Sequence, residues 1–525
     1  MNIDKDLLSI QEARELSRRA KEAQMEFKHF SQDQVDRIVK AMADAGYAAA
    51  EKLAKMACEE SGFGKWQDKV VKNQFATKNV WESIKDLKSC GVIESLHGGK
   101  VLKIAEPMGV VAALVPSTNP TSTAMFKAII SLKCRNGIVA SPHPRTVNCT
   151  AEALAIVAQA AEREGAPKGL IQCLRTPTIE GTEALMKDKN IAVILATGST
   201  PMVKAAYSSG TPAYGVGAGN VPAFIEKSAN VKKAVLDIVY GTTFDNGTLC
   251  SSEQAMIVDR SIRETAIAEA KSAGCYFVNE EEKKKLGAAI LKGGRVNPEI
   301  VGKPAPWIAN YAGFTVPENI KVLVAECDKV GKEEPLSYEK LSPILAFYTV
   351  DGWLEGCHRC IDLLHFGGVG HTMVIHSNDR EIIMKFALEK PAFRILCNTV
   401  SSIGAVGYTT ALLPSLTLGP GTWGGSIVSE NVSAKHLMNI KHLAFEVNPV
   451  NHGNSLSGMG DNITRSQSYL QEIEERLRAR AGNPVINQNN AMKEIPKKET
   501  KNQESSGEKT LTAAEVQKII DEFKF

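Results

Sequence analysis

The sequence predicts an α/β fold built from two doubly wound domains, followed by a helix on a tether. Three observations lead to this prediction. The chain has 525 residues, which is too long for one ordinary domain. Short apolar runs alternate with helical patterns, as in parallel sheets whose two faces are covered by helices. A polar loop that contains Cys250 separates two such series.

Composition and charge argue against several classes of protein. Hydrophobic residues make up 43% of the chain and charged residues 23%, as in ordinary globular proteins. A net charge of +3 does not indicate nucleic-acid binding, and no apolar run is long enough to cross a membrane. The first residues lack the apolar centre of a signal peptide, and the eleven cysteines have no regular spacing. We therefore expect a cytoplasmic protein with free thiols.

The first domain is expected at residues 1–245. Residues 1–90 place apolar groups at helical spacing without Gly-Pro punctuation, which predicts helices. Strands are then predicted at 101–105, 109–115, 137–141, 170–174 and 191–196, with helices at 122–136, 150–164 and 180–188. This alternation indicates a parallel sheet with helices on both faces.

The second domain is expected at residues 246–435. A helical stripe at 231–241 leads into the Cys250 loop, and a strand is predicted directly after the loop at 254–259. Further strands are predicted at 344–350, 371–377 and 393–399. Because catalytic clefts favour domain junctions and the carboxyl ends of parallel strands, a cysteine at this junction is a candidate for catalysis.

The C-terminal part has a different composition. Residues 483–510 are polar and poor in large apolar groups, which is typical of a flexible linker. Residues 511–525 predict a short amphipathic helix with a capping box, and its apolar face consists of Val516, Ile519, Ile520 and Phe523. Such a helix needs a partner surface. A separate docking peptide is favoured over packing on its own domain.

Two glycine-containing stretches are candidates for close backbone approach. Residues 194–200, "ILATGST", read as a strand end, a Gly-Ser turn and a helix start, which suits phosphate or ribose but also fits an ordinary turn. Residues 214–220, "YGVGAGN", precede a predicted strand and not a helix, so they do not form a dinucleotide fingerprint. We expect another group to approach this backbone closely.

The sequence predicts no metal site. The "CHRC" segment at 357–360 is a single pair without a second pair at zinc spacing, and two structural cysteines on a helix explain it better. His365, His371 and His376 surround a glycine-containing loop. One of them is a candidate for the catalytic cleft, although a packing role is the default for each.

The residues alone leave two interpretations of Cys250. Polar, turn-rich neighbours keep a thiol reachable, which suits a nucleophile that reacts as the thiolate. A buried structural thiol is the alternative. Composition and spacing do not choose between them.

Five motifs, in order, resemble the aldehyde dehydrogenase superfamily over residues 10–450. They are "EPMGVVAALVPSTNPT", "ATGSTPMVKAA", "GVGAGNVPAFIE", "NGTLCSSEQ" and "EKLSPILAFY". "SPHPRT", "GHTMVIH" and the cysteine loop resemble the CoA-acylating branch, which includes acetaldehyde and propionaldehyde dehydrogenases of bacterial microcompartments. The resemblance implies a dimer or tetramer built through a strand arm. The candidate arm segments are 92–106 and 440–450. Residues 436–482 would again belong to the arm and the nucleotide-binding domain.

The resemblance also implies roles for individual residues. Cys250 would be the nucleophile, and Asn119 with the Cys250 backbone N–H would form the oxyanion hole. Glu339 would contact the nicotinamide ribose. The expected cofactor groove is lined by Pro116, Ser117, Thr118, Ser141, Pro142, Gly198, Ser199, Val216 and Gly217.

One departure from the family pattern indicates the acyl acceptor. Hydrolytic members carry a general-base glutamate at the position that falls on Val216 here. Without that base, water should attack a thioester slowly and a bound thiol can react instead. A lysine that often contacts the adenosine ribose is replaced by Ser141, which leaves NAD versus NADP open.

The resemblance therefore implies oxidation of acetaldehyde or propionaldehyde, with NAD and coenzyme A, to acyl-CoA. A hydrolytic aldehyde dehydrogenase is the alternative, and the Asn119/Cys250 pair argues against a non-enzymatic scaffold. Residues 511–525 resemble an encapsulation helix, which implies a microcompartment shell protein as partner and a location inside that compartment.

Overall fold

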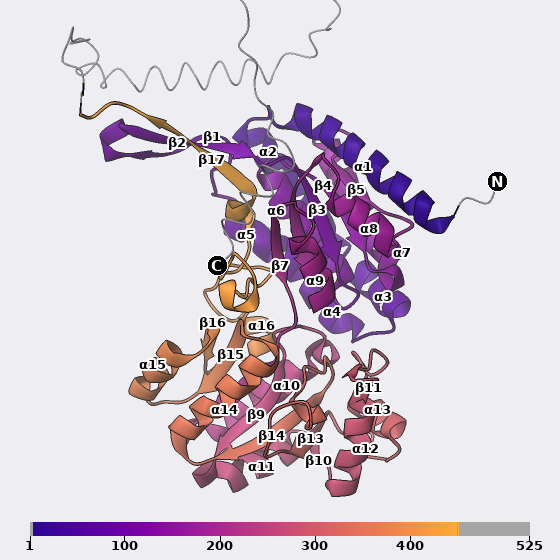
Figure 1. The fold of residues 1–525 in the computed structure, drawn as a ribbon, viewed down its shortest axis with the longest axis vertical. Coiled ribbons are helices and arrows are strands. Elements are labelled where there is room, and N and C mark those ends of the chain that lie inside the picture. Colours follow the sequence, from indigo (N-terminus) through magenta and orange to yellow (C-terminus); the bar gives the residue numbers. More distant parts are fainter. Residues whose placement is uncertain (1–3, 449, 451–525) are drawn as a thin grey trace, which may run out of the picture. The chain divides into compact units, whose positions relative to one another are not determined.

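Two parallel sheets organise the part of the chain that the computed structural model describes, residues 4–448 and 450 (Figure 1). The first has five strands in the order β5-β4-β3-β6-β7, and we call it and its helices the first lobe. Its strands are β3 (Val110–Val115), β4 (Gly137–Pro142), β5 (Ile171–Cys173), β6 (Ile191–Thr197) and β7 (Ala213–Val216). These bounds confirm the strands predicted at 109–115, 137–141, 170–174 and 191–196 to within a few residues, whereas the strand predicted at 101–105 lies in another sheet and the strand at 213–216 was not predicted.

Helices cover both faces of this sheet. Successive β3 residues point to opposite faces, and all six are buried, so each face needs an apolar cover. Val111, Ala113 and Val115 share a core with α2, α6 and α7, whereas the alternate residues share a core with α1, α8 and α9. The helices are α1 (Lys5–Phe27), α2 (Gln32–Ala48), α3 (Ala50–Ser61), α4 (Trp66–Gln74), α5 (Val80–Ile84), α6 (Pro120–Lys133), α7 (Val147–Arg163), α8 (Ile179–Met186) and α9 (Thr200–Tyr207).

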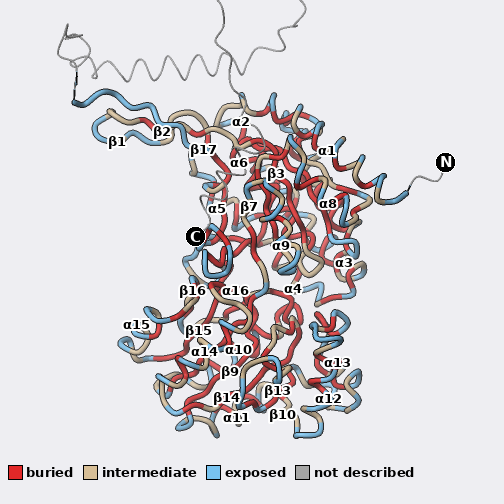
Figure 2. The backbone as a smooth tube through the Cα atoms, in the orientation of Figure 1, coloured by how far each residue is buried: buried red, intermediate tan, exposed pale blue. Residues whose placement is uncertain are grey.

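The second lobe is built on a seven-stranded sheet in the order β10-β13-β14-β9-β8-β15-β16. Every neighbouring pair in it is parallel. The strands are β8 (Val221–Ile225), β9 (Glu253–Asp259), β10 (Cys275–Phe277), β13 (Val322–Glu326), β14 (Ile344–Val350), β15 (Gly370–His376) and β16 (Ala392–Cys397). The helices are α10 (Val231–Thr243), α11 (Arg263–Ser272), α12 (Glu280–Ile290), α13 (Ala305–Ala312), α14 (Gly352–Gly367) and α15 (Arg380–Glu389). Figure 2 shows the central strands of both lobes, such as β3 and β9, as buried.

The predicted boundary at 245/246 is wrong. The chain enters the second sheet between β7 and β8, because β8 pairs with β9 and β15. A lone strand carries no signal of which sheet it will join. The sequence pattern therefore assigned β8 to the first domain, although it belongs to the second sheet. The boundary at 435 is also misplaced, since Val428 and Val432 already pack in a first-lobe core.

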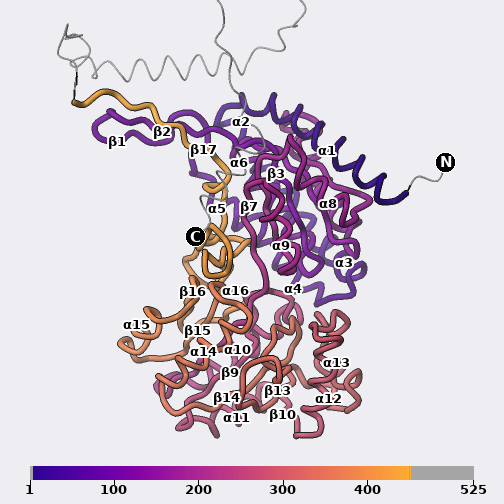
Figure 3. The backbone as a smooth tube through the Cα atoms, viewed as in Figure 1, coloured from indigo at the N-terminus to yellow at the C-terminus, as the bar shows by residue number. Residues whose placement is uncertain are grey.

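A three-stranded antiparallel sheet joins distant parts of the chain (Figure 3). It consists of β1 (Gly91–Leu96), β2 (Val101–Pro107) and β17 (Met438–Ala444), and we call it the arm. All seven β17 residues pair with β2, and six of them are exposed. The two segments expected to form an arm therefore pair with each other. The predicted linker and helix at 483–525 lie outside the described residues.

Other features of the described residues bear on the sequence predictions. None of the helices there is both long and apolar enough to span a membrane. All eleven cysteines are free. Cys357 and Cys360 are buried on α14, as expected of structural cysteines.

Phe224 tests the placement of β8. Its side chain is fully buried, and its ring stacks on that of Phe386 at 5.5 Å. We expect Phe224→Ala to destabilise the second lobe by about 3–5 kcal/mol, because it leaves a cavity in the sheet's core. Urea unfolding of wild type and variant measures this. The control Leu388→Ala removes an exposed side chain and should change stability by less than about 0.5 kcal/mol. Equal stability of Phe224→Ala and wild type would contradict the assignment of β8.

Candidate active site

The predicted site residues gather where opposite ends of the two sheets meet. Residues 116–119 follow β3, Pro142 ends β4, and Gly198 follows β6, so the first lobe contributes the carboxyl ends of its strands. Cys250 precedes β9, Glu339 precedes β14, and His371 lies at the start of β15. The second lobe therefore contributes amino ends. The carboxyl-end rule applied to Cys250 is wrong, because that loop enters its strand and does not leave it.

The loop before Cys250 has an unusual backbone. Asp245, Asn246 and Gly247 all lie in the left-handed region, with φ of 50°, 52° and 74°. Such a conformation costs a non-glycine residue about 1 kcal/mol or more and persists only where surrounding contacts impose it. Here the Asp245 N–H donates to the Asp68 carboxylate at 2.7 Å, and the Asn246 amide donates to the Gly302 carbonyl at 2.9 Å.

A buried ion cluster holds the same loop from the first lobe. Asp245 Oδ2 accepts hydrogen bonds from Lys69 Nζ at 2.8 Å, Lys72 Nζ at 2.5 Å and the Thr248 hydroxyl at 2.7 Å. Both lysines are on α4, and all three charged side chains are buried. Burial lowers the pKa of Lys72 to about 8 despite the nearby carboxylate. Burial also opposes ionisation of Asp245, but the two lysines hold its pKa below the ordinary value.

Asn119 connects this cluster to the cysteine loop. It is the N-cap residue of α6, and Pro120 follows it at the first helical position. Asn119 Oδ1 accepts from Lys72 Nζ at 2.5 Å, and its Nδ2 donates to the Thr248 carbonyl at 3.3 Å and the Thr118 hydroxyl at 3.1 Å. Thr248 lies two positions before Cys250. Asn119 thus contacts the loop that carries Cys250.

The surroundings of Cys250 disfavour its thiolate in the protein without ligands. Burial, and next the charge of Glu339, raise the pKa of the thiol to about 12, while Arg394 and the residue's own backbone N–H act in the opposite direction. Gly219 packs against it so closely that a Cβ there would lie 2.1 Å from the Cys250 carbonyl oxygen and 3.1 Å from His371 Nδ1. The group expected to approach residues 214–220 is therefore another part of the same chain, the Cys250 loop.

His371 is buried beside this corner. Burial and then Arg394 lower its pKa to about 3, so the ring is neutral. Its Nδ1 lies 3.0 Å from the Thr372 hydroxyl, which accepts from Arg394 Nε at 3.2 Å. A threonine hydroxyl can accept two hydrogen bonds and donate one, so this contact is compatible with either neutral tautomer of His371. His371 Nε2 has no partner among the described residues.

Glu339 lies close enough to Cys250 for its charge to raise the pKa of the thiol, and its predicted contact with the nicotinamide ribose stays a prediction. Its Oε1 accepts from the Gly219 N–H at 3.0 Å. Burial raises its pKa to about 8. A carboxyl with this pKa is partly protonated near neutral pH, so it can both accept and release a proton.

The predicted nucleotide groove keeps an open turn. Ser199 is the exposed N-cap of α9 without a side-chain cap bond, and a Cβ at Gly198 would meet nothing within 4 Å. An uncapped helix start beside an open glycine suits phosphate or ribose, so these residues fit a dinucleotide. Ser141 instead shares a hydrogen bond of 2.8 Å with Thr182. Val216 is buried among apolar side chains, and Gly217 lies near Thr200.

Sequence reasoning missed Lys69, Lys72 and Arg394. Lysines on a helix usually face solvent, so Lys69 and Lys72 gave no signal until the partner loop was in place. Arg394 did carry one, because an arginine inside the apolar strand "FRILC" must find polar partners. It donates to the Gly419 carbonyl at 2.8 Å and leaves Nη1 without a partner among the described residues.

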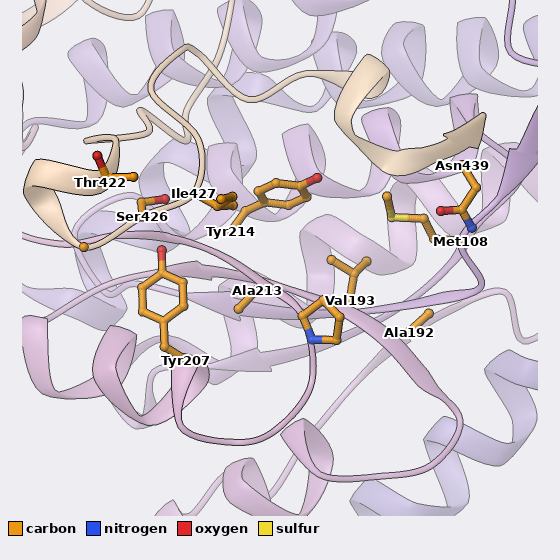
Figure 4. Close-up of a pocket in the computed structure, with 12 residues that line it drawn as sticks. Met108, Ala192, Val193, Tyr207, Ala213, Tyr214, Thr422, Ser426, Ile427 and Asn439 are labelled. Carbon is orange, nitrogen blue, oxygen red and sulfur yellow. The ribbon is translucent and has the colours of Figure 1, made fainter. Parts of the chain in front are cut away.

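A cavity of about 640 Å³ lies elsewhere in the first lobe (Figure 4). It is bordered by β7 and the loop at 422–427, and Tyr207, Tyr214, Ser426 and Asn439 are among its lining residues. None of the predicted site residues lines it.

Comparison with known proteins identifies the family. The model of the aldehyde dehydrogenase family matches residues 7–293. The bifunctional aldehyde–alcohol dehydrogenase of Escherichia coli strain K12 is 45% identical over 441 residues, covering 83% of this chain and 50% of that protein. The chain thus spans about half the length of such bifunctional relatives. It belongs to the aldehyde dehydrogenase family.

Solved structures agree with this assignment. An acetylating aldehyde dehydrogenase from Geobacillus thermoglucosidasius is 51% identical with a TM-score of 0.84, covering 86% of this chain and 100% of that one. Two propionaldehyde dehydrogenases are more distant. That of the Clostridium phytofermentans fucose utilisation microcompartment is 29% identical, with a TM-score of 0.74 and coverage of 82% and 96%. That of Rhodopseudomonas palustris, solved with bound CoA and an acylated cysteine, is 28% identical, with a TM-score of 0.75 and coverage of 82% and 97%.

The reactivity of Cys250 tests the electrostatics of the site. With a pKa of about 12, its alkylation rate should rise about tenfold per pH unit from pH 7 to pH 10, because only the thiolate reacts. At pH 9 Glu339→Gln should speed alkylation by removing a negative charge, and Arg394→Met should slow it by removing a positive one. Iodoacetamide labelling followed by mass spectrometry of the Cys250 peptide measures these rates. A rate already constant above pH 7 would show that the thiolate is present at neutral pH.

Proposed function

We propose that this aldehyde dehydrogenase oxidises a short-chain aldehyde, acetaldehyde or propionaldehyde, with NAD and coenzyme A, and releases acyl-CoA. The observation that carries the proposal is the hydrogen bond from the Asn119 amide to the loop of Cys250. It supports a site in which the Cys250 nucleophile and the Asn119 donor for the oxyanion act on the same carbonyl. The acylated cysteine and bound CoA of the Rhodopseudomonas palustris relative support the same chemistry.

The residues act in a defined order. Cys250 Sγ, as the thiolate, adds to the aldehyde carbon, and the carbonyl oxygen becomes an oxyanion. Asn119 Nδ2 and the Cys250 N–H donate to it, and a charged oxygen accepts more strongly than the neutral groups that Asn119 bonds otherwise. NAD, when bound, supplies the hydride acceptor. Collapse of the oxyanion leaves a thioester on Cys250.

Coenzyme A completes the cycle by thiol exchange. Its thiolate attacks the thioester carbon, a new C–S bond forms, and the bond to Cys250 Sγ breaks, which regenerates the Cys250 thiolate. One thioester replaces another, so we expect a reversible reaction. Val216 supports coenzyme A rather than water as the acceptor of the acyl group, because an apolar side chain occupies the position where hydrolytic members carry their general base.

A hydrolytic aldehyde dehydrogenase is the second candidate, and Glu339 favours it. The carboxyl lies near Cys250 and has a pKa of about 8, which suits a general base for water. Its hydrogen bond to the Gly219 N–H argues for a fixed role in holding the loop. The acyl acceptor therefore has to be measured directly.

The need for CoA separates the two candidates. Without CoA, we expect about one NADH per subunit and acylated Cys250, followed by slow acid release, because no thiol removes the acyl group. With CoA, turnover should continue and yield acyl-CoA. Cys250→Ala should abolish both the NADH formed without CoA and the turnover with CoA. Stopped-flow absorbance, mass spectrometry and product analysis with NAD and with NADP measure this. Full turnover to acid without CoA, lowered about 100-fold or more by Glu339→Gln, would establish the hydrolytic function instead.

The arm and the C-terminal helix extend the proposal to partners. We propose a dimer or tetramer in which the exposed arm contacts another subunit, because six of the seven β17 residues are exposed. We also propose that residues 511–525 bind a microcompartment shell protein and place the enzyme inside that compartment. The amphipathic pattern of these residues supports this, and so does the microcompartment origin of the Clostridium phytofermentans relative.

Deletion of residues 483–525 tests the role of the tail. The site lies entirely in the preceding residues, so kcat and KM should stay within about twofold of wild type while loading into shells is lost. Co-purification with shells and steady-state kinetics measure the two properties. A control that replaces only Val516, Ile519, Ile520 and Phe523 with serine should behave like the deletion. An inactive or unfolded truncated protein would show that the tail belongs to the enzyme's own fold.

A further inference from the structure

We propose that Lys72 is a positioning residue that fixes the Asn119 amide with its Nδ2 group, and not its oxygen, available to the reacting carbonyl. The proposal rests on the proposed function, because it takes Asn119 as the oxyanion donor. It adds a residue outside the five family motifs, on a helix that no sequence pattern connects with the site.

The amide of an asparagine has two ends of similar size and opposite hydrogen-bonding character. Exchange of the two ends by rotation about the side-chain bond would present an acceptor to the oxyanion, and two negative ends would repel each other. An ammonium group has three donors and no acceptor. With Lys72 Nζ at 2.5 Å, only the oxygen of Asn119 can occupy the near end, so the NH₂ group is directed to the other side.

All three donors of Lys72 serve this one junction. They go to Asn119 Oδ1 at 2.5 Å, Asp245 Oδ2 at 2.5 Å and Thr248 Oγ1 at 3.0 Å. Asn119 comes from the first lobe, and Asp245 and Thr248 belong to the loop that carries Cys250. A single buried ammonium thus sets the position of one oxyanion donor relative to the loop that supplies the other. Its charge at the amide oxygen also polarises the amide and strengthens the Nδ2–H donor.

Lys69 provides a matched control. It lies one turn before Lys72 on α4 and also pairs with Asp245, but its second hydrogen bond goes to the Thr118 carbonyl at 3.0 Å and not to Asn119. The cluster holds two lysines and one aspartate. Replacing either lysine with methionine therefore leaves one lysine paired with Asp245. Both variants lose one buried ammonium, and only one of them loses the contact with the amide.

A double-mutant cycle on kcat tests the proposal. Lys72→Met should lower kcat about 100-fold, the usual effect of losing one oxyanion donor. In the Asn119→Ala background, the same change should lower kcat less than about threefold, because the group through which Lys72 acts is gone. Lys69→Met should lower kcat by the same factor in both backgrounds. Steady-state turnover measures kcat, and pre-steady-state NADH formation measures the rate constant of the acylation step, which should change in the same way. Thermal unfolding verifies that each variant is folded.

The outcomes are distinct. If Asn119→Ala leaves kcat unchanged, the oxyanion role in the proposed function fails and the role of Lys72 falls with it. If Asn119→Ala is damaging but the effects of Lys72→Met and Asn119→Ala multiply, only the positioning role is overturned. Should Lys72→Met fail to fold, Lys72→Gln keeps a donor at similar reach. Its loss of kcat should then be smaller and should again disappear in the Asn119→Ala background, and persistence of that loss would overturn the proposal.

Discussion

The candidate site depends on one buried carboxylate, that of Asp245. It pairs with two lysines from α4, accepts from Thr248 in its own loop, and belongs to a residue with left-handed backbone. A single buried charge is costly, but a paired and fully hydrogen-bonded cluster is tolerated, and its loss leaves uncompensated charge. The same contacts therefore join the two lobes and impose the loop conformation that brings Cys250 to its position.

The two parallel sheets contribute opposite ends to the site. Carboxyl ends of strands are followed by turns and helix starts, which present backbone N–H groups and suit phosphates. The open turn at Gly198 and Ser199 is of this kind. The amino ends of the second sheet are entered by loops, and these supply the sulfur, a carboxyl group and a neutral imidazole. In the proposed function, the turn for the dinucleotide and the nucleophile Cys250 come from different lobes, and Asn119 of the first lobe contacts the Cys250 loop through Thr248.

Three ionisable groups at the site, Cys250, Glu339 and His371, are disfavoured in their charged forms. Burial raises the pKa of Cys250 and of Glu339 and lowers that of His371. Arg394 is the nearby cation, and it favours the Cys250 thiolate while disfavouring a charged His371. Such a site keeps its nucleophile unreactive until the charge distribution changes. A bound dinucleotide with a positively charged nicotinamide ring would add a positive charge, which stabilises a thiolate.

Many strands and helices of the described residues could be predicted from the sequence, and so could two candidate site residues. Apolar runs of β-length fix strands such as β3 and β6 locally, and the motifs around Asn119 and Cys250 marked the chemistry without any knowledge of the fold. Local pattern does not determine which strands pair. It therefore placed β8 on the wrong side of the domain boundary, and the carboxyl-end rule was applied to Cys250 although a strand follows its loop.

Tertiary structure alone decided the partners of the charged groups. Lys69 and Lys72 have the helical pattern of surface lysines and become buried only because the loop of Asp245 closes over α4. Glu339 was assigned to a ribose from its motif, yet its distance to Cys250 depends on the pairing of β14 with β9. Electrostatic interactions act through space, whereas a sequence records only distance along the chain. For that reason the nucleophile could be named from the sequence, and the groups that control its charge could not.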